Sequence, residues 1–221
     1  MLDHKTRYLQ IAFNDDLATA LRLLPRIPSS PRILIEAGTP FLKREGIAGL
    51  RTLRRLWKGP LVADLKTSDG GANEVEMAAS GGATAITALG SSPTETLDLF
   101  IEACRQHQMV AMIDMLGVSD PLEVLRPLRT PPDVVVLHRG RDEELTAGKI
   151  IQYRHVNRIR SKFDVIISAA GGVDLREARS AIFNGANIVV VNIVKPGDVW
   201  NGISSDQPVG EIAQQFLNTI E

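Results

Sequence analysis

The feature that most constrains the fold is a regular alternation of short β-branched runs with longer stretches of helical periodicity. The short runs are rich in Val, Ile and Ala, as buried parallel strands are. We expect strands at Tyr8–Phe13, Arg32–Ala37, Leu61–Lys66, Ala83–Leu89, Met109–Met115, Asp133–His138, Asp164–Ala169 and Asn187–Ile193. The periodicity between them predicts helices at Leu17–Leu24, Glu45–Trp57, Asn73–Ala79, Thr94–His107 and Leu175–Phe183.

This alternation is compatible with two α/β architectures, a closed barrel and a doubly wound open sheet. The even spacing of the expected strands and the length of 221 residues favour a single (β/α)8 TIM barrel. No linker or change of composition divides the chain, so we expect one domain over residues 1–221. We interpret Gly202–Pro208 as an extended loop before a last helix.

Composition excludes several classes of partner. The net charge of −1 gives no electrostatic reason to expect nucleic acid or a membrane surface as a partner. No apolar run approaches the length of a membrane span, and the first residues do not form a signal peptide. The single cysteine, Cys104, indicates a reducing compartment and reads as a buried structural thiol. We therefore expect a cytoplasmic protein.

Charged side chains interrupt the third expected strand near its C-terminal end. Because side chains alternate along a strand, Asp64 and Lys66 lie on the same face. Active sites of α/β barrels form at this end, and an enclosed ion pair is costly unless it is used. We interpret the pair as catalytic; the alternative is a buried ion pair that sets the strand register. Asp69 follows in a loop where Gly70 and Gly71 allow a sharp turn.

The second expected strand also ends in a carboxylate, Glu36. Alone it could equally be a solvated loop residue. Together with Asp64 it forms a plausible pair of oxygen ligands for a divalent metal such as Mg2+, which binds one or two carboxylates and keeps several waters. No His and Cys cluster suggests zinc.

Three further strand ends carry candidate site residues. Asp114 is an acidic group within an apolar run. His138 ends the sixth expected strand beside two arginines, where it could act as an acid, a base or a partner of a substrate hydroxyl. A structural histidine is the alternative. Gly171 and Gly172 form a turn whose N–H groups could bind phosphate, a weak signal strengthened by its place after the seventh strand. His155 reads as a surface residue.

In chain order, these segments resemble the orotidine-monophosphate-decarboxylase superfamily of barrels. Within it they resemble the group that contains 3-hexulose-6-phosphate synthase and 3-keto-L-gulonate-6-phosphate decarboxylase. The most specific motif is Asp-x-Lys-x-x-Asp at Asp64, Lys66 and Asp69. The other segments that carry the resemblance are Leu9–Ala12, Glu36–Pro40, His138–Asp142 and Ala170–Val173. They extend along nearly the whole chain.

The resemblance implies a metal-dependent reaction of a small phosphorylated sugar through an enediolate. It implies Mg2+ held by Glu36 and Asp64, and a role for Lys66 in stabilising the enediolate and transferring a proton. It also implies a homodimer with shared active sites, because the residue matching Asp69 acts across the subunit interface. Both aldol addition and decarboxylation pass through an oxyanion beside a carbon nucleophile, which a metal and a lysine can stabilise.

The choice of reaction rests on different motifs. Residues matching His138 and Arg141 act as acid, base or water-positioning groups in the decarboxylase. The version Asp-Leu-Lys-Thr-x-Asp, with Ile113–Val118, is more similar to archaeal-type hexulose-phosphate synthases. Our leading hypothesis is therefore a 3-hexulose-6-phosphate synthase-like lyase, and the runner-up is a 3-keto-L-gulonate-6-phosphate decarboxylase-like or orotidine-monophosphate-decarboxylase-like enzyme.

Two segments depart from the family pattern. The first strand ends in Asn14 where the family has Asp. The eighth strand and the residues after it, Val191–Gly197, lack the Gly-Arg pair that binds phosphate in the family. Lys195 could substitute as a flexible point charge. We expect substrate or phosphate contacts from Asn14, Gly171, Gly172, Asn192 and Lys195. These departures also motivate a third hypothesis, a catalytically reduced barrel that binds a phosphorylated metabolite.

Overall fold

The computed structural model describes residues 2–146 and 148–221, in which parallel strands close into a barrel. Each strand pairs with the next in sequence, and β1 also pairs with β8 through Leu9↔Val189 and Ile11↔Val191. The barrel strands are β1 Tyr8–Phe13, β2 Ile33–Ala37, β3 Leu61–Thr67, β4 Ala85–Leu89, β5 Val110–Asp114, β6 Val134–His138, β7 Ile166–Ala170 and β8 Ile188–Val194. The expected (β/α)8 TIM barrel is confirmed, with strand ends shifted by a few residues.

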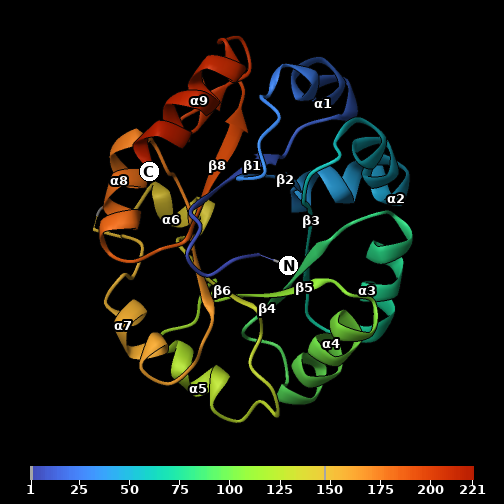
Figure 1. Cartoon of the computed structure of the whole chain (residues 1–221), viewed down its shortest axis with the longest axis vertical. Helices are drawn as coiled ribbons and strands as arrows, with labels where there is room; N and C mark the ends of the chain where they lie inside the picture. Colours follow the sequence, from blue (N-terminus) through green and yellow to red (C-terminus); the bar gives the residue numbers. More distant parts are fainter. Residues whose placement is uncertain (1, 147) are drawn as a thin grey trace.

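Helices surround the strands as a ring (Figure 1). Their bounds are α1 Leu17–Leu23, η1 Leu24–Arg26, α2 Thr39–Leu56, α3 Gly71–Ser80, α4 Thr94–Gln106, α5 Pro121–Leu125, α6 Arg141–Glu144, α7 His155–Arg160, α8 Leu175–Phe183 and α9 Val209–Thr219. The N-terminal segment crosses one end of the barrel, where Leu2 packs against the interior cluster (Figure 1). The polar cavity described below lies at the opposite end.

Three local expectations are wrong. Helix α2 begins at Thr39 and not at Glu45, because Gly38 and Pro40 form a helix start and the expected start lies beside an interruption at Gly46, whose φ is 58°. The stretch expected to be a loop contains β9, Ile203–Ser204, which extends the β8 edge. His155 is buried, because its helix packs its first turn inward.

Two apolar clusters hold the barrel together. One fills the space between strands and helices and includes Phe13, Phe41 and Phe100. It also contains Cys104, which is fully buried, as expected of a structural thiol, and burial raises the pKa of that thiol. The second cluster fills the barrel interior and includes Leu34. Burial of this apolar surface is the main stabilising contribution to the fold.

The interior of the barrel changes from apolar to polar between one inward-facing residue of a strand and the next. Side chains two residues apart share a face. The inward pairs are Leu34 and Glu36, Val62 and Asp64, Met112 and Asp114, Val136 and His138, and Val190 and Asn192. An apolar layer therefore lies beneath a polar layer at the C-terminal ends of the strands.

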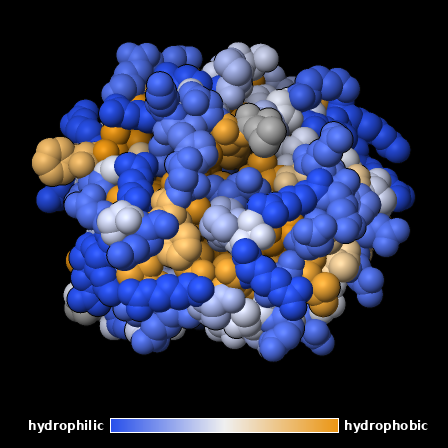
Figure 2. All heavy atoms as spheres, turned by 60° about the horizontal axis from the view of Figure 1, so that its bottom comes forward, coloured by the Kyte–Doolittle hydropathy of each residue, from blue (hydrophilic) through white to orange (hydrophobic). Residues whose placement is uncertain are grey.

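The outer surface is mostly hydrophilic in the face shown in Figure 2, with apolar side chains visible mainly in its hollows. Larger exposed apolar side chains include Phe183 at the end of α8 and Leu99 on α4. In the described part of the chain, no helix combines the length and the apolar character needed to cross a membrane.

Candidate active site

The polar layer is organised around an irregularity in β3. The register between β3 and β4 shifts between Ala63 and Thr67, and Lys66 adopts a φ of 50°, which is rare for a residue other than glycine. The Lys66 N–H donates to Thr87 Oγ1 at 2.9 Å and stabilises this turn of the backbone. A bulge of this kind re-aims a side chain, and strained backbone concentrates at functional sites.

The re-aimed lysine lies between two carboxylates. Lys66 Nζ is 3.1 Å from Asp64 Oδ1 and 2.6 Å from Asp114 Oδ2. His138 Nδ1 lies 2.8 Å from the same Oδ2 of Asp114. The Asp114 carboxylate is only 2% exposed and thus bridges the ammonium and the imidazole. Three strand ends, β3, β5 and β6, are locked into one charged array.

The array shifts the pKa of its carboxylate and the pKa values of its two basic groups in opposite directions. Burial disfavours the charged form of Asp114, but His138 and Lys66 outweigh it and hold the pKa of Asp114 below its usual range. Burial likewise opposes charge on Lys66 and on His138, yet the neighbouring carboxylates raise the pKa of both. Lys66 is therefore an ammonium at neutral pH, suited to donating hydrogen bonds and stabilising negative charge.

Asp64 is held from both sides by hydroxyl groups. Thr39 Oγ1 donates to Asp64 Oδ2 at 2.8 Å, and Thr87 Oγ1 donates to Asp64 Oδ1 at 2.8 Å. Beside it, Glu36 accepts a hydrogen bond from the Gln10 side chain. Burial, followed by the charge of Asp64, raises the pKa of Glu36 to about 7.

Glu36 and Asp64 fit the requirements of a Mg2+ site. Both line the same cavity. The pKa of Glu36 is raised first by burial and then by the charge of Asp64, and a cation between the two carboxylates would offset both effects. Within residues 2–146 and 148–221, Gln10 is the sole hydrogen-bond donor to Glu36, so lone pairs remain for a ligand. Oxygen donors of this kind suit a hard cation, although no group of three or more potential protein ligands gathers among the described residues.

The seam between β1 and β8 carries amides in place of charges. Asn14 Nδ2 donates to Asn192 Oδ1 at 2.9 Å, so the side chains that end β1 and approach the end of β8 contact each other. A Cβ added to Gly38 would lie 2.1 Å from Asn14 Oδ1, which means that the position of Asn14 requires a glycine there. The two asparagines and the glycine behave as one packed unit.

The remaining wall comes from α6 and the turn after β7. The Arg141 guanidinium lies 5.2 Å from the ring centroid of Trp200, a distance at which cation–π attraction operates. At the turn, Gly171 has a φ of 108° and Gly172 a φ of 63°, both in the region that favours glycine. Arg139 donates to the Gly171 carbonyl at 2.9 Å and covers the turn.

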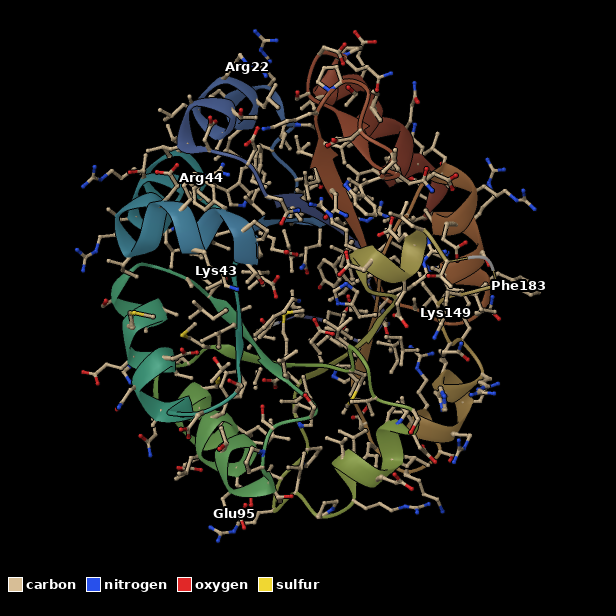
Figure 3. The ribbon with its side chains drawn as sticks, turned by 180° about the vertical axis from the view of Figure 1, so that it is seen from behind. Arg22, Lys43, Arg44, Glu95, Lys149 and Phe183 are labelled. Atoms are coloured by element: carbon tan, nitrogen blue, oxygen red, sulfur yellow. The ribbon has the colours of Figure 1, made fainter. Side chains whose placement is uncertain are left out.

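These walls enclose a cavity of about 420 Å³ at the end of the barrel that faces the viewer in Figure 3. Of the residues expected in the site, those that line it are Asn14, Glu36, Asp64, Lys66, Asp114, His138, Arg141, Gly171 and Asn192. Three others lie outside it. Asp69 is exposed on the loop after β3, Gly172 is buried within the turn after β7, and Lys195 lines an adjoining hollow.

Sequence reasoning missed three residues that hold the carboxylates. Gln10 and Thr87 are polar side chains at inward positions of apolar strands, so the alternation pattern carried a signal for both. Thr39 had no such signal, because it belongs to the first turn of α2, where a loop was expected.

The sequence is similar to a known protein family and to several known proteins. A model of the Orotidine 5'-phosphate decarboxylase / HUMPS family matches residues 2–192. A protein named Bifunctional enzyme Fae/Hps from Methanothrix thermoacetophila is 37% identical over 216 residues, which is 97% of this chain and 53% of that protein. The chain thus spans about half the length of the curated relatives it matches.

Solved structures share the architecture. The 3-hexulose-6-phosphate synthase from Salmonella typhimurium superposes with a TM-score of 0.83 at 23% identity, covering 96% of this chain and 98% of that one. The KGPDC from Streptococcus mutans gives a TM-score of 0.77 at 19% identity, covering 98% of each chain. At this level of identity the likeness shows the fold.

Proposed function

Because the chain belongs to the Orotidine 5'-phosphate decarboxylase / HUMPS family, we propose that it is a 3-hexulose-6-phosphate synthase-like lyase. The reaction is the addition of formaldehyde to ribulose 5-phosphate, or its reverse, through an enediolate. The observation that carries the proposal is the array in which Asp114 bridges Lys66 and His138 beside the carboxylates Glu36 and Asp64. The Fae/Hps relatives support it by name.

The array supplies the proton transfers. Nδ1 of His138 is engaged by Asp114, which leaves Nε2 to accept the proton from C1 of the ketose. The C–H electron pair then forms the C1–C2 double bond of the enediolate, and the π electrons of the C2 carbonyl move to its oxygen. As the oxygen on C2 re-forms its carbonyl double bond, the C1–C2 π electrons attack the carbon of formaldehyde and the formaldehyde π electrons move to its oxygen. The imidazolium then returns its proton to that alkoxide. Asp114 stabilises the imidazolium between these steps.

Negative charge on the substrate oxygens needs stabilisation throughout. Lys66 provides a fixed ammonium, because its raised pKa keeps it protonated. Glu36 and Asp64 would hold Mg2+, which supplies Lewis acidity toward the same oxygens. Thr39 and Thr87 orient Asp64 and so keep its carboxylate in place.

We also propose a small phosphorylated sugar as substrate and a homodimer as the active form. The absence of Asp69 from the lining of its own cavity, and its exposure on the β3–α3 loop, support a role at the partner's site. Mixing Lys66→Met protein with Asp69→Asn protein tests this. If sites are shared, reassociated dimers regain about a quarter of wild-type activity, because half of them contain one intact site. No recovery despite subunit exchange contradicts sharing.

A second candidate reaction is decarboxylation of 3-keto-L-gulonate 6-phosphate. The specific observation in its favour is Arg141, which lines the cavity and lies over Trp200. Release of carbon dioxide from that substrate, compared with formaldehyde consumption, separates the two candidates.

The experiment that tests the proposal is an assay of ribulose 5-phosphate with formaldehyde, with Mg2+ and with a chelator. We expect product formation that requires the metal and is lost in Lys66→Ala. Purified, folded protein that gives no hexulose phosphate under any of these conditions would contradict the proposal. Retained activity in Lys66→Ala would contradict the assigned chemistry.

A further inference from the structure

A second hollow of about 260 Å³ adjoins the catalytic cavity. The two share Asn14, Pro40 and Arg141 as a common wall, so one elongated ligand can extend from one into the other. We call this hollow the annex. The Thr19 and Ser205 hydroxyl groups contribute to its lining. The annex lies on the β1 and β8 side of the barrel mouth, opposite the charged array.

Two cations from distant segments converge in the annex. Arg44 Nη1, from α2, lies 3.0 Å from Asp15 Oδ1. Lys195 Nζ, from the loop after β8, lies 3.2 Å from the same oxygen atom. One carboxylate therefore holds two cations in place, while it can neutralise only one of their charges.

The charge of the annex as a whole is positive. Arg141 adds a third cation, and its partner, the Trp200 indole, is neutral and leaves that charge uncancelled. Against these three cations, the lining carries two carboxylates, Asp15 and Asp198. Asp198 already accepts the Lys195 backbone N–H at 2.9 Å. Cations fixed in a concave site attract an anion, and the guanidinium of arginine matches a phosphate in geometry.

The glycine turn after β7 carries less net positive charge than the annex. A Cβ at Gly172 would lie 2.3 Å from Arg139 Nη2 and 2.7 Å from Glu144 Oε2, so both side chains pack directly against the turn. Any dianion bound there would meet the Glu144 carboxylate as well as the Arg139 guanidinium. Burial raises the pKa of the half-buried Glu144 carboxyl, while the charges of Arg139 and Arg141 act in the opposite direction.

We propose that the annex binds the phosphate group of an acyclic sugar phosphate, with Arg44 and Lys195 as its main ligands and Arg141 at the junction. The inference rests on the proposed function for the reacting end of the ligand, which lies at Lys66 and His138. Arg44 belongs to a helix outside the barrel, so this site differs from the turn that the sequence indicated. The cations, preset by Asp15, stand in for the absent Gly-Arg pair.

The test measures binding of inorganic phosphate by calorimetry at low ionic strength, with no turnover involved. The variants are Arg44→Met and Lys195→Met, with Lys43→Met as the matched control. Figure 3 shows Lys43 on the side of α2 toward α3 and Arg44 on the side toward α1. We expect each annex variant to weaken phosphate binding by about fivefold or more, with the control close to wild type.

A further variant, Glu144→Gln, distinguishes the two places. Tighter phosphate binding in Glu144→Gln, with no effect of Arg44→Met or Lys195→Met, would overturn the proposal in favour of the glycine turn. An equal loss in the Lys43→Met control would overturn it as a general charge effect. In assays, the annex variants should raise KM for ribulose 5-phosphate and leave the rate with unphosphorylated ribulose unchanged. If phosphate binding depends on the annex residues but the protein has no lyase activity, the proposed function is contradicted and the phosphate site in the annex is supported.

Discussion

The two sides of the barrel mouth are built differently. Between β3 and β6, Asp64, Lys66, Asp114 and His138 are buried or half-buried and joined by ion pairs and hydrogen bonds. Between β8 and α2, neutral amides and exposed cations line the site, and Lys195 and Arg44 keep more than half of their side-chain surface in solvent. A locked array suits chemistry that every related substrate shares. A looser, more exposed wall can change with the substrate.

The largest expected effect lies on the locked side. Replacing Lys66 with Met removes the ammonium that stabilises the enediolate and leaves Asp64 and Asp114 facing each other in a buried site. We expect kcat to fall by a factor on the order of 10² to 10³, the range found when one stabilising group is removed from an oxyanion site. Steady-state kinetics, with Lys43→Met as control, measure it. A loss below tenfold would break the comparison, because it would make the array dispensable.

Removing the Asp114 carboxylate, which bridges Lys66 and His138, should give the next largest loss of activity and should also change the pH dependence of kcat/KM. Asp114→Asn removes the carboxylate that raises the pKa of His138, so that pKa should fall and the acidic limb of the kcat/KM profile should move to lower pH. The plateau should also drop by about 10 to 10² because the imidazolium loses its partner. A lower plateau with an unmoved limb would show that Asp114 acts on structure and not through His138.

The Glu36 carboxylate should lower the stability of the metal-free protein at high pH and should strengthen the binding of a metal. Its pKa of about 7 in the folded chain exceeds its ordinary value of 4.5, so the folded protein binds more protons than the unfolded one between these values. Stability therefore falls as pH rises through this window, and the loss is complete above about pH 7. In chelator at pH 8, Glu36→Gln should be more stable than wild type by on the order of 1–3 kcal/mol, and equal near pH 4.5.

Thermal unfolding checks this prediction, and Mg2+ provides its control. Added Mg2+ should stabilise the wild type at pH 8 and have little effect on Glu36→Gln, whose neutral amide is a weaker ligand. Equal stabilisation of both proteins by Mg2+ would place the metal away from Glu36.

The contrast between the two sides also explains what could be predicted. The strands and the inward positions of Asp64, Asp114 and His138 follow from alternation, which depends only on neighbouring residues. The contact between Lys66 and Asp114 does not follow, because it depends on a bulge and a positive φ at a lysine, which no local pattern indicates. Arg44 was missed for a similar reason, since it belongs to a helix whose start was misplaced.

The amide pair at the seam should give the smallest effect and sharpen the comparison most. Asn14→Asp has nearly the same shape. It cannot donate the hydrogen bond that Asn14 Nδ2 gives to Asn192 Oδ1, but a flip of the Asn192 amide lets Asn192 donate instead, so folding and kcat should change little. It adds a negative charge to the wall that the annex shares with the catalytic cavity, which opposes an anionic substrate. We expect KM to rise by roughly two- to fivefold, and the rise to shrink with added salt. If kcat falls instead, Asn14 takes part in the reaction, and the division of the barrel mouth into a reacting side and a recognition side does not hold at β1.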